Sequence, residues 1–305
     1  MAVYVNTNVS SLNGRRYLNN VQNQLTTTYQ RLSSGMRINS AKDDAAGLQI
    51  ADRLTTQING LNQGNRNTND GIALAQTIEG ALDETSSMLQ KIRTLAVQSA
   101  NGTNTAEDRK ALTTEGNALV AEITRIAQQT KFGGKTVLNG ATGAETIYGS
   151  QVATADRGKG AKLTLQVGAN KGDEISFDVA AFTFKDILSA VKGTPGDVTK
   201  AATNTAIILS AASSAKAAIA LMDAMIAKVD SQRSGLGAIQ NRLESSIRNQ
   251  SNVAANQSDA RSRIRDADFA EESANLSQQS IIQQAATSML MQANSRPQLA
   301  LSMLG

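Results

Sequence analysis

The side chains of this chain that could do chemistry are carboxylates, amines, guanidinium groups and hydroxyls, because its 305 residues include no histidine and no cysteine. Their absence excludes the usual zinc sites, a Ser–His or Cys–His nucleophile pair, and a disulfide. Catalysis by paired carboxylates is formally possible, but we expect no enzymatic activity and no cofactor or metal. The 30 basic and 26 acidic residues give a net charge of +4 and are interspersed. A mixed, solvated surface is therefore favoured over nucleic-acid binding.

One informative group of capping and charged residues lies in residues 31–54, RLSSGMRINSAKDDAAGLQIADRL. Gly35 is free to take the left-handed conformation that ends a helix. Ser40, Asp43 and Asp44 can then cap or charge the first turn of the next helix. The small residues that follow, from Ala45 to Gly47, leave room for another backbone. The segment therefore predicts an elbow between two helices.

The composition indicates that long helices must position this elbow. The chain is 40% hydrophobic but only 3% aromatic, and it contains two prolines. Ala, Leu, Ile and Val must then form the buried surface, which suits thin helix–helix seams better than a thick core.

Apolar residues recur at helical spacing in the first 130 residues. One seam comprises Leu18, Val21, Leu25 and Leu32, with Thr28 in the missing place. A second comprises Leu74, Ile78, Ala81, Met88, Ile92 and Leu95, with Thr85 in the gap. Asn101–Gly102 ends that helix, and Thr105 with Asp108 resembles a capping box for the next one. We expect that next helix to stop at Gly133–Gly134.

In the middle of the chain, the spacing of apolar residues changes from helical to alternating. Residues 163–167 and 175–179 alternate between apolar and polar, with a glycine-bearing loop between them, which predicts a β-hairpin. Phe182 to Val191 could hold one more short element. From residue 197 to 296 no proline occurs, and a seam from Ile208 to Val229 predicts a long helix. An interruption is plausible at Gly235 and Gly237 or in the region from Ser258 to Asp268.

The predicted fold class is mainly α: a long coiled-coil-like helical rod with the N- and C-terminal helices packed together and a small β-hairpin region mid-chain. The outermost helices are amphipathic but thin, so we expect them to be disordered in an isolated monomer and ordered on contact with other copies. A stable terminal coiled coil within one monomer is the alternative. Pro297 is expected to end the last helix, before an apolar tail. We find no Sec-type signal peptide and no run of roughly 18 to 20 apolar residues that would span a membrane.

Five blocks of this sequence resemble bacterial flagellin, the subunit of the flagellar filament. They are RLSSGMRINSAKDDAAGLQIADRL (31–54), NDGIALAQTIEGALDETSSMLQKIRTLAVQSANGT (69–103), QQTKFGGKTVLNG (128–140), LQVGANKGD (165–173) and SQRSGLGAIQNRLESSIRNQSNVAANQSDARSRIRDADFAEES (231–273). The resemblance covers roughly residues 1–140 and 200–305, in order.

The resemblance implies a secreted, extracellular subunit that polymerises into the hollow helical filament used for swimming. It also implies export in an unfolded state through the flagellar type III system, an export chaperone, contacts with hook–filament junction and cap proteins, and no membrane insertion. The implied inner domain comprises residues 1–43 and 256–305, with the elbow as a spoke. The outer helical rod with its β-hairpin comprises 44–140, 161–180 and 197–255. A short variable surface region is expected at 141–160 and 181–196, without a large outer domain.

Candidate functional residues fall into three sets. The subunit-interface candidates are Val5, Val9, Leu12, Arg31, Arg37, Asp43, Asp44, Leu276, Ile281, Ile282, Met289 and Leu290. The chaperone-binding tail candidates are Leu299, Leu301 and Leu304. The resemblance further implies recognition by a vertebrate Toll-like receptor, with Gln90, Lys91, Arg93, Leu95, Gln98 and Glu115 as contacts. The charged elbow residues could instead be caps and solvated charges, and the receptor set could instead pack against neighbouring subunits.

Three other classes of protein compete with a filament subunit. A hook–filament junction protein shares similar ends, but blocks 69–140 would fit it less well. A signalling coiled coil, such as a chemoreceptor hairpin, is disfavoured by the central β-hairpin. Some flagellins carry a metalloprotease insert, but that insert requires a histidine-bearing zinc motif.

Overall fold

The computed structural model describes residues 7–140, 146–147, 161–191 and 201–302. The chain divides into two compact units. One, here called the terminal unit, comprises Met1–Asn59 and Val253–Gly305, and the other, the central unit, comprises Gly60–Asn252. The N-terminal boundary of these units lies at residue 59, inside a helix, and the predicted inner domain of residues 1–43 and 256–305 stays a prediction.

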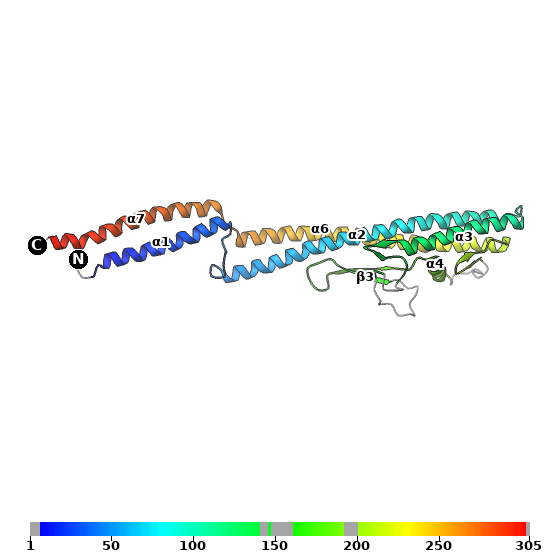
Figure 1. Cartoon of the computed structure of the whole chain (residues 1–305), viewed down its shortest axis with the longest axis horizontal. Coiled ribbons are helices and arrows are strands. Elements are labelled where there is room, and N and C mark those ends of the chain that lie inside the picture. Colours follow the sequence, from blue (N-terminus) through cyan, green and yellow to red (C-terminus); the bar gives the residue numbers. More distant parts are fainter. Residues whose placement is uncertain (1–6, 141–145, 148–160, 192–200, 303–305) are drawn as a thin grey trace. The chain divides into compact units, whose positions relative to one another are not determined.

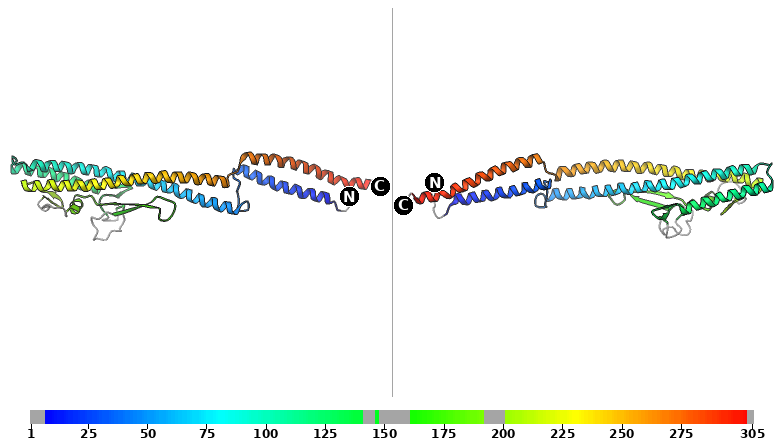
Figure 2. Two further views of the ribbon diagram at one scale, coloured as in Figure 1. Left: turned by 180° about the vertical axis from the view of Figure 1, so that it is seen from behind. Right: turned by 45° about the horizontal axis from the view of Figure 1, so that its top comes forward.

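The terminal unit is built on two helices, α1 (Val9–Ser34) and α7 (Phe269–Ser302), which lie side by side (Figures 1 and 2). Helix α1 begins at Asn8, whose side chain accepts a hydrogen bond from the Ser11 amide at 3.0 Å. It ends at Gly35, which has a φ of 70° and donates its N–H to the Arg31 carbonyl, as predicted. Helix α7 continues through Pro297, so the prediction that Pro297 ends it is wrong. A proline removes one backbone hydrogen bond, and here the helix persists despite that loss.

The two connections between helices of the terminal unit lie against each other in the elbow. Helix α2 (Ala45–Ala100) starts after the first connection, and helix α6 (Ala212–Arg265) ends at the second. Met36 and Asp266 form an antiparallel bridge, the Arg37 amide donates to the Arg265 carbonyl at 2.7 Å, and the Ala267 amide donates to the Gly35 carbonyl at 3.0 Å. The interruption therefore lies within Ser258 to Asp268, while α6 runs unbroken through Gly235 and Gly237.

The start of α2 confirms the predicted cap and corrects the role of its small residues. The Asp44 carboxylate accepts a hydrogen bond from the Gly47 amide at 2.9 Å. A Cβ at Gly47 would lie 2.4 Å from the Asp44 carboxylate and 2.8 Å from the Ile38 side chain. Gly47 thus makes room for its own cap and for Ile38, and not for another backbone.

The central unit packs the remaining lengths of α2 and α6 against α3 (Ala106–Gln129) (Figure 1). Helix α3 begins with the predicted capping box, in which Thr105 and Asp108 bond each other's backbone amides. It ends at Gln129, earlier than predicted. Gly133 and Gly134, with φ values of 57° and 82°, form the turn between β1 (Lys131–Phe132) and β2 (Lys135–Thr136).

The predicted β-hairpin is confirmed. Strands β3 (Ala161–Gln166) and β4 (Glu174–Val179) pair antiparallel, with Leu163 opposite Phe177. A further pair, β5 (Ala202–Thr203) and β6 (Ala206–Ile207), occupies part of the segment that we expected to be helical. The Asn117 side chain on α3 accepts the Ile207 amide at 2.7 Å, so a tertiary hydrogen bond holds this turn, and α6 begins only at Ala212.

The core of the central unit includes a segment predicted to be variable surface. Helix α4 (Phe184–Val191) lies within residues 181–196, and Phe182, Phe184, Ile187 and Leu188 are each 1% exposed or less. These side chains complete the core against α2, α3 and α6, so this part of the predicted surface region is corrected. The α2 seam is confirmed, and its Thr85 hydroxyl donates to the Ala81 carbonyl at 2.9 Å.

Three glycines of α2 form a seat for the β3–β4 hairpin. A Cβ at Gly60 would lie 2.6 Å from the Ala169 Cβ, one at Gly64 would lie 2.0 Å from the Val167 carbonyl oxygen, and one at Gly71 would lie 2.3 Å from Leu165. The side-chain amide of Asn67 on the same helix donates to the Gln166 carbonyl at 2.9 Å. The hairpin therefore lies in backbone contact with the helix.

Gly64→Ala should destabilise the central unit by about 1–3 kcal/mol, because the added methyl overlaps a backbone carbonyl that cannot move without the hairpin. Gly80→Ala is the matched control on the same helix, since nothing lies within 4 Å of its Cβ position. That change should be neutral or stabilise by up to about 1 kcal/mol through helix propensity. Urea unfolding followed by circular dichroism measures both, and equal midpoints for the two variants would contradict the proposed seat.

Candidate assembly interface

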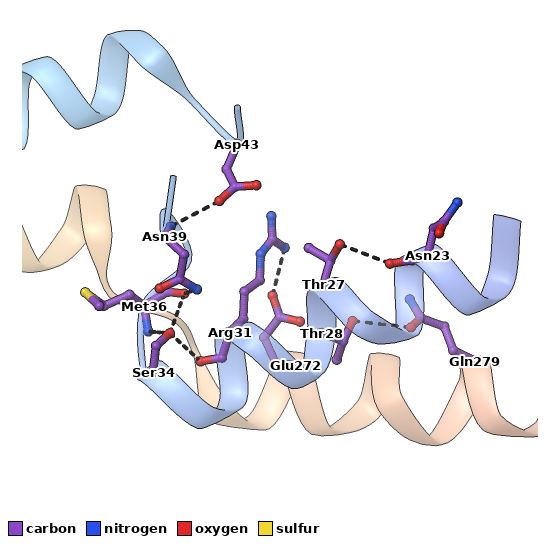
Figure 3. A network of polar contacts seen from close by, with 10 residues as sticks. All are labelled: Asn23, Thr27, Thr28, Arg31, Ser34, Met36, Asn39, Asp43, Glu272 and Gln279. Carbon is purple, nitrogen blue, oxygen red and sulfur yellow. Dashed lines mark hydrogen bonds and ion pairs between the residues drawn. The ribbon is translucent and has the colours of Figure 1, made fainter. Parts of the chain in front are cut away.

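Polar side chains fix the alignment of α1 and α7 (Figure 3). Near one end of the pair, Arg31 donates to the Glu272 carboxylate at 2.9 Å, and Thr28 donates to the Gln279 side chain at 3.3 Å. Near the other end, the side-chain amide of Asn8 donates to the Ala293 carbonyl at 2.7 Å. Residue numbers rise along one helix as they fall along the other, so the helices run antiparallel.

The Arg31–Glu272 pair occupies a favourable place in both helices. Arg31 lies in the last turn of α1 and Glu272 in the first turn of α7, where a cation and an anion respectively complement the helix dipoles. The Glu272 side chain is 8% exposed. Desolvating a carboxylate is costly unless it is paired, so this contact favours one alignment of the helices over others.

The charged residues of the elbow also bond within the chain. The Asp43 carboxylate accepts the amides of Ser40 at 2.9 Å and Asn39 at 3.1 Å, and these bonds lower the pKa of Asp43. Arg37 donates to the Ile264 carbonyl at 2.7 Å. Arg31, Arg37, Asp43 and Asp44 were predicted as contacts between subunits. Their bonds within the chain are consistent with the alternative that they are caps and solvated charges, and their role between subunits stays a prediction.

An apolar groove follows the α1–α7 pair and has a volume of about 700 Å³. Its lining comprises Ser10, Asn13, Gly14, Tyr17, Val21, Ile282, Ala285, Ala286, Met289, Gln292 and Ala293. None of these lining residues is charged, although Arg15 and Arg16 lie between Gly14 and Tyr17 on α1. The groove therefore offers an uncharged surface to whatever covers it.

Many of the predicted interface residues are exposed on this pair. Ile281 is 67% exposed and Met289 69%, and Val9, Leu12 and Ile282 are also exposed. Leu276 and Leu290 are half-buried, and Val5 lies outside the described residues. The sequence reasoning missed Tyr17, which is 71% exposed in the groove, and Gly14, which lets Leu290 approach α1.

The receptor candidates lie on the central unit. Lys91 pairs with Glu115 at 3.6 Å, and Arg93 bonds Asp223 on α6, which raises the pKa of the Arg93 guanidinium. Gln90 and Gln98 are exposed. Leu95 is only 7% exposed and belongs to the core, so it is removed from the set of surface contacts.

The described residues contain no helix long and apolar enough to cross a membrane, and no cluster of acidic side chains suited to a metal ion. The backbone of Leu299 and Leu301 is helical, whereas Leu304 lies outside the described residues. The tail prediction therefore stays untested.

Comparison with known proteins places these features in a family. The model of the bacterial flagellin N-terminal helical region matches residues 5–142, and that of the C-terminal helical region matches residues 219–304. Flagellin A of Vibrio anguillarum is 38% identical over 379 aligned positions that cover all of both chains. Flagellin B of Vibrio cholerae serotype O1 is 37% identical over 376 positions, again with full coverage.

The chain belongs to the bacterial flagellin family. This flagellin is therefore a structural subunit of the extracellular flagellar filament, into which it polymerises for motility. Membership of a structural family is consistent with the expected lack of enzymatic activity. A solved structure of a protein described as flagellar hook-associated, from Vibrio parahaemolyticus, shares the fold, with a TM-score of 0.55 and 17% identity over 73% of this chain and 100% of the other.

Asp43→Asn should remove a pH dependence from the elbow of this flagellin. Because the folded pKa of Asp43 is depressed below its ordinary value of 3.8, its bonds stabilise the elbow fully above about pH 4 and are lost as the pH falls through the folded pKa. Hydrogen exchange of residues 36–44, measured from pH 5 to pH 2, should show this loss in the parent protein and not in the variant. Asp52→Asn, an exposed change on α2, is the control. An unchanged pH profile in Asp43→Asn would rule out this role.

Proposed function

We propose that this flagellin polymerises by covering the outer faces of its α1–α7 pair with the α1–α7 pairs of neighbouring copies, and that the pair gains most of its stability in doing so. The observation that carries this proposal is how little the pair buries by itself. Among the described side chains of α1 and α7, only Val21, Thr28 and Glu272 are buried.

Two helices with so little buried surface are marginal in isolation. Ordering each residue costs roughly 1–2 kcal/mol of backbone entropy, and burial returns only about 25 cal/mol per Å² of apolar surface. Ile281, Met289 and Tyr17 are exposed, so the apolar surface of these side chains does not yet contribute to stability. A neighbouring copy that covers them lets the helices fold and the contact form together.

The geometry of such contacts explains a fibre. An antiparallel pair presents different residues on its successive faces, so one copy's groove meets a different face of the next copy. Heterologous contacts of this kind do not close on themselves, and they continue as a helical polymer.

The same surface suits the other partners that the family implies. We infer that an export chaperone covers the apolar C-terminal region, including Leu299, Leu301 and Leu304, before assembly. Hook–filament junction and cap proteins would meet the α1–α7 faces at the two ends of a filament. Passage through the type III export system in an unfolded state is consistent with a chain that has no disulfide and few aromatic residues.

Ile282→Gln should prevent extension of sheared filament seeds, because it places a polar amide in the groove that a neighbour must cover. Ile50→Gln is a matched control, since Ile50 is 43% exposed and Ile282 42%, but Ile50 does not line the groove. Electron microscopy of seeded reactions measures filament length. Normal extension by Ile282→Gln would refute the proposed interface, and capping of seeds by the parent protein would favour a junction protein instead.

A second role concerns the central unit. We propose that a vertebrate Toll-like receptor contacts the exposed surface around Gln90, Lys91, Arg93, Gln98 and Glu115. Family resemblance supports this role, as does the position of four of these side chains on the exposed side of α2, with Glu115 beside them on α3.

Lys91→Arg should strengthen receptor activation several-fold, because a guanidinium can form two parallel hydrogen bonds where an ammonium forms one. Lys110→Arg, an equally conservative change at an exposed position of α3, should leave activation unchanged. Dose–response curves in receptor-reporter cells measure both variants. No difference between them would count against Lys91 as a contact.

A further inference from the structure

The most exposed sulfur-containing side chains described in this flagellin lie on one helix, two residues apart. Met289 is 69% exposed and Met291 is 68% exposed, and both belong to α7. The other described methionines, at positions 36, 88, 222 and 225, are half-buried or buried. Met289 and Met291 are therefore equally open to an oxidant in solution.

The two methionines face different surroundings. Two residues of an α-helix subtend about 200°, so the side chains point to nearly opposite faces. Met289 lines the α1–α7 groove with Tyr17 and Ile282, whereas Met291 does not. A change in the chemistry of Met289 therefore acts on the groove, and the same change at Met291 acts elsewhere.

We propose that Met289 is a reversible oxidation site that controls whether a subunit can enter the filament. A peroxide transfers one oxygen atom to the thioether sulfur; the O–O bond breaks, the sulfur is oxidised to a sulfoxide, and the peroxide is reduced to water or an alcohol. The product is a polar acceptor in place of a flexible apolar side chain. This inference rests on the proposed function, because it requires that a neighbouring copy covers the groove.

The cost of oxidation follows from the lining of the groove. On α7 the lining around Met289 includes Ala285, Ala286 and Ala293, and its donor-bearing members are Gln292 on α7 and Ser10, Asn13 and Tyr17 on α1. Covering the sulfoxide takes its oxygen out of water and puts a polar group where an apolar side chain packed, which disfavours the docked state. In a finished filament the same cover protects the sulfur, so oxidation acts on subunits before they assemble.

The test compares the two methionines within one molecule. The parent flagellin is partly oxidised with hydrogen peroxide, added to sheared seeds, and separated by centrifugation into filament and free subunit. Fragmentation mass spectrometry then measures the sulfoxide at each position. We expect the sulfoxide of Met289 to be depleted about tenfold in the filament fraction, and that of Met291 to be equal in both fractions.

A pair of variants gives an independent readout. Both variants carry Met303→Leu, which removes the methionine that follows α7. The first variant also carries Met291→Leu, so that Met289 is the exposed methionine of α7, and the second carries Met289→Leu, so that Met291 is. Peroxide should stop seed extension by the first variant and not by the second, and methionine sulfoxide reductases should restore it. Equal partition of both sulfoxides, or extension by the oxidised first variant, would overturn the proposal. Failure of the untreated parent to extend seeds would instead contradict the proposed function.

Discussion

The narrow seam between α1 and α7 is the constraint on which the rest of this flagellin depends. In the central unit, three long helices, α4 and the hairpins enclose a continuous apolar core. In the terminal unit, two helices share a seam with few buried side chains and leave Ile281, Met289 and Tyr17 exposed. The central unit can fold by burying its own surface, whereas in the proposed assembly the terminal unit completes its burial with other copies. In that assembly, polymerisation is the step in which the chain finishes folding.

Polar contacts determine the geometry of this incomplete seam, and apolar burial provides its energy. The Arg31–Glu272 pair, the Asp43 and Asp44 caps, and the Gly35–Ala267 backbone bond all align the helices at the elbow. Arg31 Nε and Glu272 Oε2 have no hydrogen-bond partner among the described residues. A buried pair that is incompletely bonded adds little stability, but it disfavours other alignments. The two helices α1 and α7 thus present one defined surface to a neighbour, even though their packing is only marginally stable.

Local signals made much of this fold predictable, and long-range contacts account for the errors. The capping box at Thr105, the left-handed Gly35 and the alternation in β3 and β4 each depend on residues close in sequence. The two-residue strands of β5 and β6 are too short to show a period, and a hydrogen bond from α3 holds them. The burial of α4 and of Leu95, and the Glu272 partner of Arg31, arise from segments distant in sequence. The sequence predicted thin amphipathic helices at both ends of the chain but not the groove between them. The groove depends on how closely Leu290 approaches Gly14, a contact between distant segments.

The most direct test of this account is amide hydrogen exchange measured at one pH on free subunits and on filaments. In free subunits, residues 9–34 and 269–295 should exchange rapidly, while the buried stretch of α2 from Leu74 to Leu95 stays protected. In filaments, exchange in both terminal helices should slow at least about a hundredfold, with little change in α2. Terminal helices that are as protected in free subunits as α2 is would show that the seam is sufficient by itself, and would contradict the central claim.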